Sequence, residues 1–400
     1  MRVEIEKMDD FGRGIAYLYD KVVFVPKTVV GDIVNIEIVN DKKKYSIAKV
    51  LEIITPSKLR IKEKCPFYQR CGGCSMQNVE YRIELDYKLQ KINNLLKKNK
   101  IDYTVKDIIK SDKRFNYRNK VSLKIENGIV GYYERETHNI VEIDSCNLVN
   151  TYINDLIEDL NKLKIQNGKV IIRSNVQNEL LLILETKHYS KQGIKYLVNK
   201  HRIAGIVVNK ECVFGSDFFV DKIGDYKFKI SYNSFFQINP YICNELFKEV
   251  KKHTKDVNEL IDLYSGVGTL SIVAKENAKS VMGVEIVDNA AFNAKTNSIL
   301  NKVNDVTFIA SDTNKITSYI EDKDFVIVDP PRSGLTTKVI DAIKHYKVEK
   351  VLYISCDPNT LIRDLKLLNN YEIKEFKLFD MFPNTYHVES MVLLENKLMR

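Results

Sequence analysis

The first part of this chain alternates between apolar and polar residues in short, closely spaced segments. These segments cover residues 2–8, 14–20, 21–26, 32–40 and 46–54. Alternation with a period of two predicts strands that each bury one face. Five such strands within residues 1–56 predict a small closed β-barrel, of which the OB-fold is one type. A barrel of this kind either binds nucleic acid or caps another domain, and we favour the first role.

The pattern changes after the barrel to one long helical stretch followed by further strand-like segments. Apolar residues with helical spacing predict a helix near 79–98. Alternating segments follow it at 119–127, 129–136, 169–174 and 179–186. This mixture predicts an α+β region at 57–235.

From about residue 241 the chain alternates between helical stretches and nearly continuous apolar runs. The runs lie at 259–264, 280–287, 306–311, 324–330 and 350–356. Apolar strands that alternate with helices are typical of a doubly wound parallel sheet of the α/β class. We therefore divide the chain into parts at 1–56, 57–235 and 236–400, and note that the helix near 79–98 could pack on the third part.

Charge and cysteine content narrow the class of protein. Lys and Arg outnumber Asp and Glu by 62 to 53, a net charge of +9 that permits an anionic partner such as RNA. No apolar run has the length of a membrane span, and the N-terminus lacks the apolar core of a signal peptide. Seven cysteines without an export signal argue against a disulfide framework. We expect a cytoplasmic monomer.

A glycine-rich turn follows the first strand of the predicted parallel sheet. Gly266 and Gly268 allow a tight turn and a close backbone approach to a ligand. Glu285 ends the second strand about 20 residues later, where a carboxylate can bind both ribose hydroxyls. The third glycine of a dinucleotide motif is absent, which favours S-adenosylmethionine. Asp312 after the third strand could approach the adenine, and Asp329 ends the fourth strand at the edge where ligands bind.

Cys356 ends the fifth strand, so it is expected at the same edge of the sheet. The helix predicted to begin beside it would lower the pKa of the thiol, as a nucleophile requires. A thiolate that adds to C6 of a pyrimidine makes C5 electron-rich enough to accept a methyl group. A base must then remove the C5 proton, and Glu389, with His387 nearby, is our candidate.

Four other cysteines have the arrangement of metal ligands. Cys65, Cys71 and Cys74 are clustered, and Cys146 is distant in sequence. Four thiolates suit either a tetrahedral zinc ion or a four-iron cluster, and their spacing does not separate the two.

Five motifs together resemble the RNA uridine-5-methyltransferase family. They are FFQIN, DLYSGVGTLS, DPPRSGL, YISCDPNTLIRDL and FPNTYHVESMVLLE. The resemblance covers nearly the whole chain and is greatest to the iron–sulfur branch of the family, which methylates 23S rRNA. It implies that residues 1–56 form an RNA-binding TRAM domain and that the four cysteines hold a [4Fe–4S] cluster, with zinc as the alternative.

The same resemblance assigns roles to individual residues. It implies that Cys356 is the nucleophile and Glu389 the base. The residues that it places against the cofactor are Gln237, Tyr264, Glu285 and Asp329. Because the tRNA-modifying branch typically lacks both the TRAM domain and the cysteine cluster, the resemblance favours rRNA over tRNA as the substrate.

One segment of the second part mixes basic and aromatic residues. Phe115 and Tyr117 could stack on bases, while Arg118 and Lys120 could meet phosphates. The alternative is a solvated basic edge. The target uridine must leave its stack to reach Cys356, so base flipping is expected.

Two other interpretations compete with uridine methylation. A cytidine-5-methyltransferase would place its cysteine after a different strand, and an adenine N6-methyltransferase would carry an aromatic residue where this chain has Arg332. A non-catalytic RNA-binding assembly factor would retain its function without Cys356.

Overall fold

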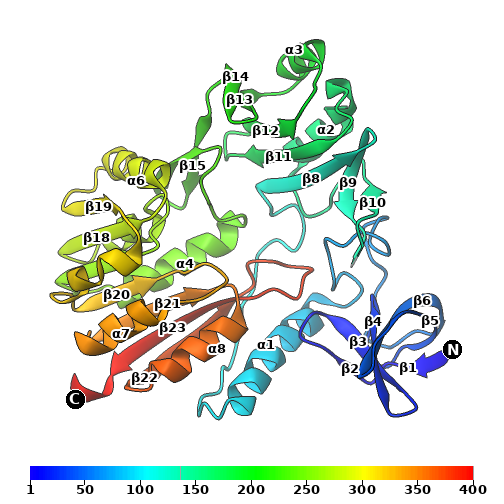
Figure 1. The fold of residues 1–400 in the computed structure, drawn as a ribbon, viewed down its shortest axis with the longest axis horizontal. Coiled ribbons are helices and arrows are strands. Elements are labelled where there is room, and N and C mark those ends of the chain that lie inside the picture. The colour runs from blue at the N-terminus through cyan, green and yellow to red at the C-terminus, as the bar shows by residue number, and fades with distance from the viewer. Residues whose placement is uncertain (136, 400) are drawn as a thin grey trace.

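The computed structural model describes residues 1–135 and 137–399, which form three lobes (Figure 1). The N-terminal barrel lies beside helix α1, Tyr81–Lys98, and the lobe around residues 120–215 lies above the barrel in this view. The large C-terminal sheet occupies the opposite side. Position 136, the last residue of the predicted segment 129–136, lies outside the described residues.

The N-terminal lobe is a six-stranded sheet that its first segment closes into a barrel. The strands are β1 Arg2–Glu4, β2 Lys7–Met8, β3 Arg13–Leu18, β4 Lys21–Pro26, β5 Ile33–Asp41 and β6 Tyr45–Thr55. The predicted segment 2–8 is divided, because β1 pairs with β5 while β2 pairs with β3 at the other end of the sheet. Alternate residues such as Val3, Val23 and Ile36 fill the interior, as the period of two predicts.

The middle lobe is a seven-stranded sheet in the order β10-β9-β8-β11-β12-β13-β14. The strands are β8 Lys120–Glu126, β9 Ile129–Tyr133, β10 Ile140–Glu142, β11 Gly168–Ser174, β12 Leu180–Thr186, β13 Ile203–Val208 and β14 Glu211–Gly215. Its helices are α2 Thr151–Asp159, η1 Leu160–Leu163 and α3 Lys191–Lys200. Asn150 and Ser190 cap α2 and α3 by accepting backbone N–H groups with their side chains.

The C-terminal lobe is built on an eight-stranded sheet in the order β19-β18-β17-β20-β21-β23-β22-β7. The strands are β17 Glu259–Leu263, β18 Ser280–Glu285, β19 Val306–Ala310, β20 Phe325–Val328, β21 Lys350–Ser355, β22 Tyr371–Phe379 and β23 Glu389–Asn396. The first five are parallel, as predicted, and β23 is antiparallel to both β21 and β22. The strand order reverses between β17 and β20, which is where such sheets bind ligands.

Helices cover both faces of this sheet. They are α4 Pro240–His253, α5 Thr269–Ala274, α6 Asp288–Leu300, α7 Thr337–His345 and α8 Pro358–Leu367, with short turns η2 Thr313–Lys315, η3 Thr317–Ile320 and η4 Lys397–Met399. Within the described residues, no helix has the length and apolar character needed to cross a membrane.

Two segments before residue 236 pack on the C-terminal lobe, so the boundary drawn at 235 differs from the structure. Strand β7, Ile108–Ile109, pairs with β22, and Leu95 of α1 lies in the core beneath the sheet. The hairpin of β15, Phe218–Ile223, and β16, Tyr226–Ser231, buries its apolar residues in the other core of that lobe. The parallel sheet alone leaves apolar surface on its edge and face, and these segments cover it.

A buried ionic network joins α1 to residues 380–388, the connection between β22 and β23 that we call the 380–388 loop. The Lys88 ammonium lies 2.8 Å from Glu84 and 2.5 Å from Asp380, and all three side chains are fully buried. Arg114 pairs with Glu84 at 3.1 Å, and the backbone N–H of Asn384 donates to Glu84. The network therefore fixes the loop that leads into β23.

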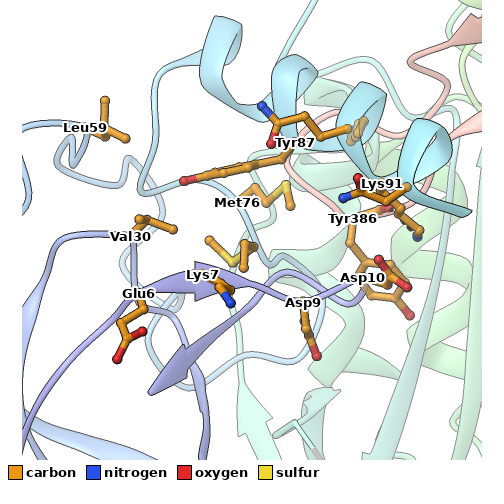
Figure 2. Close-up of a pocket in the computed structure, with 14 residues that line it drawn as sticks. Glu6, Lys7, Asp9, Asp10, Val30, Leu59, Met76, Tyr87, Lys91 and Tyr386 are labelled. Carbon is orange, nitrogen blue, oxygen red and sulfur yellow. Dashed lines mark hydrogen bonds between the residues drawn. The ribbon is translucent and has the colours of Figure 1, made fainter. Parts of the chain in front are cut away.

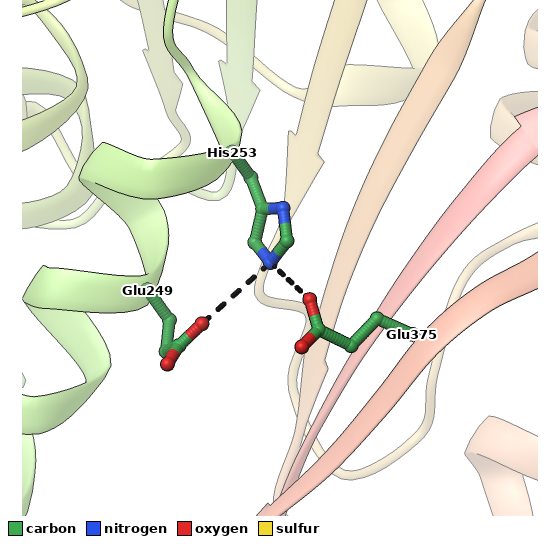
Figure 3. A group of neighbouring side chains, drawn as sticks. All are labelled: Glu249, His253 and Glu375. Atoms are coloured by element: carbon green, nitrogen blue, oxygen red, sulfur yellow. Dashed lines mark ion pairs between the residues drawn. The ribbon is translucent and has the colours of Figure 1, made fainter.

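A second group of charges joins helix α4 to β22 (Figure 3). His253 Nε2 lies 2.7 Å from an oxygen of Glu375 and 3.7 Å from one of Glu249. The same two carboxylates pair with Lys252 and Lys377. Because the lysines already balance both carboxylates, we interpret this group as an ion-pair network that holds the helix on the sheet.

Candidate active site

The turn after β17 has an open backbone that faces the carboxyl edge of the sheet. Tyr264, Gly266 and Gly268 all have positive φ angles, of 70°, 58° and 83°. A Cβ at Gly266 would meet no atom within 4 Å, so this side of the turn is free to receive a ligand. At Gly268 a Cβ would lie 2.8 Å from Phe308, so that glycine is required for packing.

Glu285 holds this turn in place. Its carboxylate accepts one hydrogen bond from the N–H of Gly266 at 2.9 Å and another from that of Val287 at 2.8 Å. Asp312 instead caps η2 by accepting from the N–H and the side-chain amide of Asn314. Gln237 precedes α4, and its carbonyl accepts from the side chain of Asn119.

Buried polar atoms around the turn fit a positively charged adenosine derivative. Asp262 is fully buried, and one of its carboxylate oxygens has no partner among the described residues; the hydroxyl of Ser265 has none either. Burial raises the pKa of Asp262 to about 7, and the nearby charges of Asp329 and Glu285 act in the same direction. Several carboxylates in one site attract a cation. S-adenosylmethionine, with its sulfonium and ammonium groups, suits this site.

Cys356 and Glu389 meet at the carboxyl edge of the same sheet. Cys356 directly follows β21, and Glu389 begins β23. The antiparallel register pairs Ser355 with Ser390, so the next position opposes Cys356 to Glu389. Asp329, which follows β20, interacts electrostatically with both side chains. The chain thus brings a thiol and two carboxyl groups together.

The protonation of this site differs from the sequence prediction. Burial and the charges of Glu389 and Asp329 together raise the pKa of Cys356 to about 11, although Arg332 acts in the opposite direction. The prediction of a lowered pKa at the start of α8 was therefore wrong for the free protein. Burial and the neighbouring Asp329 also raise the pKa of Glu389 well above its usual value, and burial raises that of Asp329 to about 7. Two close, buried carboxyl groups cannot both ionise easily.

Alkylation of the free protein measures this thiol directly. The rate at Cys356 is expected to rise about tenfold per pH unit above neutrality, towards a pKa near 11, because only the thiolate reacts. Arg332→Met is expected to slow alkylation at a given pH. Peptide mass spectrometry after iodoacetamide treatment resolves Cys356 from the exposed Cys212 as a reference. A rate that levels off near pH 7 would contradict the prediction.

The four predicted metal ligands line one cavity between the segment 65–77 and the middle lobe. These residues are Cys65, Cys71, Cys74 and Cys146. The sulfur of Cys74 accepts a hydrogen bond from Gln77 at 3.2 Å, and that of Cys71 accepts one from the N–H of Gly73 at 3.4 Å. N–H donors aimed at sulfur are typical of metal-bound thiolates.

Lys27 of the barrel connects this cavity to the N-terminal lobe. Its ammonium donates to the carbonyl oxygens of Cys71 at 3.0 Å and Cys74 at 2.6 Å. Burial lowers the pKa of Lys27 to about 8. Sequence reasoning missed this residue, because no local pattern marks a lysine whose partners lie more than 40 residues away.

The predicted RNA contacts are only partly available. Tyr117 is 2% exposed and donates its hydroxyl to the carbonyl of Pro383, so the prediction that it stacks on a base was wrong. Arg118 donates to Tyr117 and lines the cysteine cavity. Phe115 is half-buried beside Lys64. Lys120 is half-buried, and its pKa is lowered to about 8 by burial and by the charge of Arg173.

Fold and site together define a class I S-adenosylmethionine-dependent methyltransferase. Residues 80–397 match the family model of tRNA (uracil-5-)-methyltransferase, and the chain belongs to this family. Residues 1–59 match the TRAM domain of tRNA (uracil(54)-C(5))-methyltransferase, which confirms the predicted TRAM domain.

Relatives and a solved structure agree with this assignment. The chain is 33% identical to a protein of Clostridium tetani named as an uncharacterized RNA methyltransferase, over 98% of this chain and 95% of that protein. A similarly named protein of Aquifex aeolicus is 32% identical, over 99% of each chain. The structure of Pyrococcus abyssi tRNA (uracil-54, C5)-methyltransferase with S-adenosyl-L-homocysteine superposes with a TM-score of 0.82 at 27% identity, covering 98% of this chain and 100% of that one.

Proposed function

We propose that this protein methylates C5 of a uridine in a structured RNA, with Cys356 as the nucleophile and Glu389 as the base. The observation that carries the proposal is the opposition of these two residues across β21 and β23. The open turn at Gly266 follows β17, a strand of the same sheet.

In the proposed reaction the bond between the Cys356 sulfur and C6 of the uracil forms first and breaks at the end. The Cys356 sulfur adds to C6 of the uracil, and the electron pair of the C5–C6 bond moves into the ring as an enolate. S-adenosylmethionine, when bound, would supply the methyl group that C5 takes and would be left as S-adenosylhomocysteine. Glu389 then removes the C5 proton, the C5–C6 double bond forms again, and the C6–S bond breaks.

The pKa values of Glu389, Asp329 and Cys356 describe how the site is protonated before the reaction. Glu389 holds its proton near neutrality in the free protein, because burial and the neighbouring Asp329 raise its pKa well above the usual value, while burial raises the pKa of Asp329 to about 7. A cation bound near these carboxyl groups would lower the pKa of each, and Glu389 could then accept the C5 proton. Arg332 favours the thiolate of Cys356.

For the RNA substrate we propose 23S rRNA, as the resemblance to the iron–sulfur branch implies. A second candidate is tRNA, because the P. abyssi protein with the same overall fold is named for uracil 54 of tRNA. The TRAM domain no longer separates the two, since the matching TRAM model itself describes a tRNA enzyme. Adduct formation on each RNA distinguishes them.

We propose that Cys65, Cys71, Cys74 and Cys146 hold a [4Fe–4S] cluster. Among the residues that the structure describes, the one set of three or more potential metal ligands whose atoms all lie within 4.8 Å of one another is that of Figure 3, so no three of the cysteine sulfurs lie that close together. Zinc with bonds of about 2.3 Å would hold its sulfur ligands about 3.8 Å apart. The resemblance to the iron–sulfur branch is what favours the larger cluster over zinc.

Anaerobic purification tests the metal assignment. The protein is expected to bind about four iron atoms per chain and to show a broad absorption that bleaches on reduction, because four thiolates bind such a cluster. Cys146→Ser is expected to lose the iron, whereas Cys212→Ser, at an exposed cysteine outside the cavity, keeps it. Stoichiometric zinc without iron would contradict the assignment.

The proposed reaction is tested with RNA that contains 5-fluorouridine. Glu389 cannot remove fluorine from C5, so the protein and RNA are expected to stay covalently joined after methyl transfer. The wild type and Cys356→Ala are incubated anaerobically with S-adenosylmethionine and transcripts of 23S rRNA or tRNA. A denaturation-resistant band in the wild type alone supports Cys356 as the nucleophile, and mapping it identifies the uridine.

Failure of this test has a definite meaning. No band on any RNA, from protein that is folded and binds the cofactor, would favour a non-catalytic RNA-binding factor. A band on tRNA alone would overturn the 23S rRNA proposal and leave the chemistry intact.

A further inference from the structure

A cavity of about 410 Å³ lies between the barrel, helix α1 and the 380–388 loop. Figure 2 shows Lys91 and Tyr87 on the helix, Asp9 and Asp10 on the barrel side, and Tyr386 on the loop. None of these residues takes part in the chemistry proposed above. Cavities of roughly 300–1,000 Å³ suit small organic groups, and a nucleobase is one.

Aromatic rings connect this cavity to the catalytic loop. The ring of Tyr386 lies 4.1 Å from that of His387 with an interplanar angle of 33°, and edge-on to Phe11 of the barrel at 5.5 Å. Phe11 is 50% exposed, although most rings of its size are buried. The half-buried ring of Tyr386 lines the cavity with Phe11 beside it, and such a ring is a surface on which a flat ligand can stack.

Charges connect the cavity to the nucleophile. Lys91 lies 5.3 Å from the centre of the Tyr386 ring, and it interacts electrostatically first with Asp10 and then with Asp357, the residue after Cys356. His387, next to Tyr386, interacts with both Lys91 and Arg332. A chain whose backbone passes Cys356 therefore meets a cation at the entrance of the cavity, as a phosphate requires.

The cavity also offers polar groups that can select a base. The carboxylate of Asp10 makes no hydrogen bond within the part of the chain that the structure describes, and neither does the side-chain amide of Gln90 or Asn94. A carboxylate accepts hydrogen bonds and cannot donate them. It can therefore accept a hydrogen bond from an amino or imino N–H group of a base.

We propose that this cavity binds an unstacked nucleobase of the RNA, within two nucleotides of the target uridine. The inference rests on the proposed function, because a uridine that is flipped towards Cys356 leaves its neighbours unstacked. Proteins commonly stack such bases on aromatic rings. The base lies on Tyr386, and the phosphate beside it pairs with Lys91.

The test combines changes in the protein with changes in the RNA. The RNA that forms the 5-fluorouridine adduct is prepared with an abasic site at each of the two positions on either side of the target. Tyr386→Ala is expected to weaken binding of the intact RNA by about 5- to 150-fold, the range for loss of one stacked base. One of the abasic RNAs is expected to bind the wild type as weakly as the intact RNA binds Tyr386→Ala. The affinity of that abasic RNA is expected to fall little further when the protein also carries Tyr386→Ala.

Three controls make the result specific. Tyr386→Phe keeps the ring and is expected to bind normally. Tyr319→Ala removes an exposed ring outside the cavity and is expected to have no effect. Binding of S-adenosylmethionine and thermal melting report whether each variant is folded.

Each outcome decides the proposal. At each of the four positions, the loss of affinity from the abasic site could multiply with the loss from Tyr386→Ala, or Tyr386→Ala could bind the intact RNA as well as the wild type does. Either result, with the adduct still forming, would overturn the proposal that the cavity binds a nucleobase. A wild type that forms no adduct with any RNA would overturn the proposed function, and the cavity assignment with it.

Discussion

Replacing Glu389 with glutamine is expected to leave the protein covalently attached to its RNA after a single methyl transfer. Glutamine has nearly the same shape but cannot accept the C5 proton, so the C6–S bond to Cys356 persists. Turnover is expected to fall by about 10²- to 10⁴-fold, the usual contribution of a general base. A denaturing gel is expected to show the adduct of the variant with RNA that contains ordinary uridine. The wild type breaks down this adduct and releases the methylated RNA.

A control on the same strand separates catalysis from folding. Glu395→Gln changes a glutamate of β23 that pairs with Lys374 away from Cys356, and its turnover is expected to stay within about twofold of wild type. Turnover by Glu389→Gln within tenfold of wild type would exclude this residue as the base. Methylated RNA without an adduct would mean that another group takes the proton.

The second large effect is expected at Lys88, where replacement with methionine lowers the free energy of unfolding by about 3–5 kcal/mol. The change leaves Glu84 and Asp380 as buried carboxylates without their shared cation. Both are fully buried, so water cannot compensate them. Denaturant unfolding of the purified protein measures the loss.

Lys97→Met provides the matched control, because this lysine is exposed in the last turn of the same helix. Its effect is expected to stay within about 0.5 kcal/mol. The triple variant Glu84→Gln, Lys88→Met, Asp380→Asn removes all three charges and is expected to recover part of the stability. Equal losses for Lys88→Met and Lys97→Met would show that the network does not stabilise the fold.

Loss of Lys88 is also expected to affect the active site. Asp380 and Asn384 belong to the loop that leads through His387 to Glu389, and both are bonded within this network. A looser loop misplaces the base relative to Cys356, and small misplacements cost large factors in rate. The network therefore links stability to catalysis.

The carboxyl edge of the sheet was predictable because its signals are local. Gly266, Glu285, Asp329 and Cys356 each stand at the end of an apolar run, and parallel strands bring such ends to one edge. The opposition of Glu389 to Cys356 was not predictable from spacing alone. It depends on β23 inserting antiparallel between β21 and β22.

The RNA-facing residues were the weakest part of the prediction. Tyr117 lies in a segment of basic and aromatic residues that is typical of a base-stacking site, but it is buried, and its hydroxyl donates a hydrogen bond to the carbonyl oxygen of Pro383. Tyr386 and Phe11 carry no motif that marks them, and they meet only because the barrel docks beside the 380–388 loop. Contacts between distant segments leave no periodic signal in the sequence.

By itself the sequence determined the parallel sheet, the barrel, the glycine turn after β17 and the grouping of four cysteines. The signals for these features are the hydrophobic period, the glycines and the ends of apolar runs, and each extends over only a few residues. Only the tertiary structure decided the raised pKa values of Cys356 and Glu389, the cavity at Tyr386 and the place of β7. Burial and charge at a site depend on every segment packed around it, and those segments come from all parts of the chain.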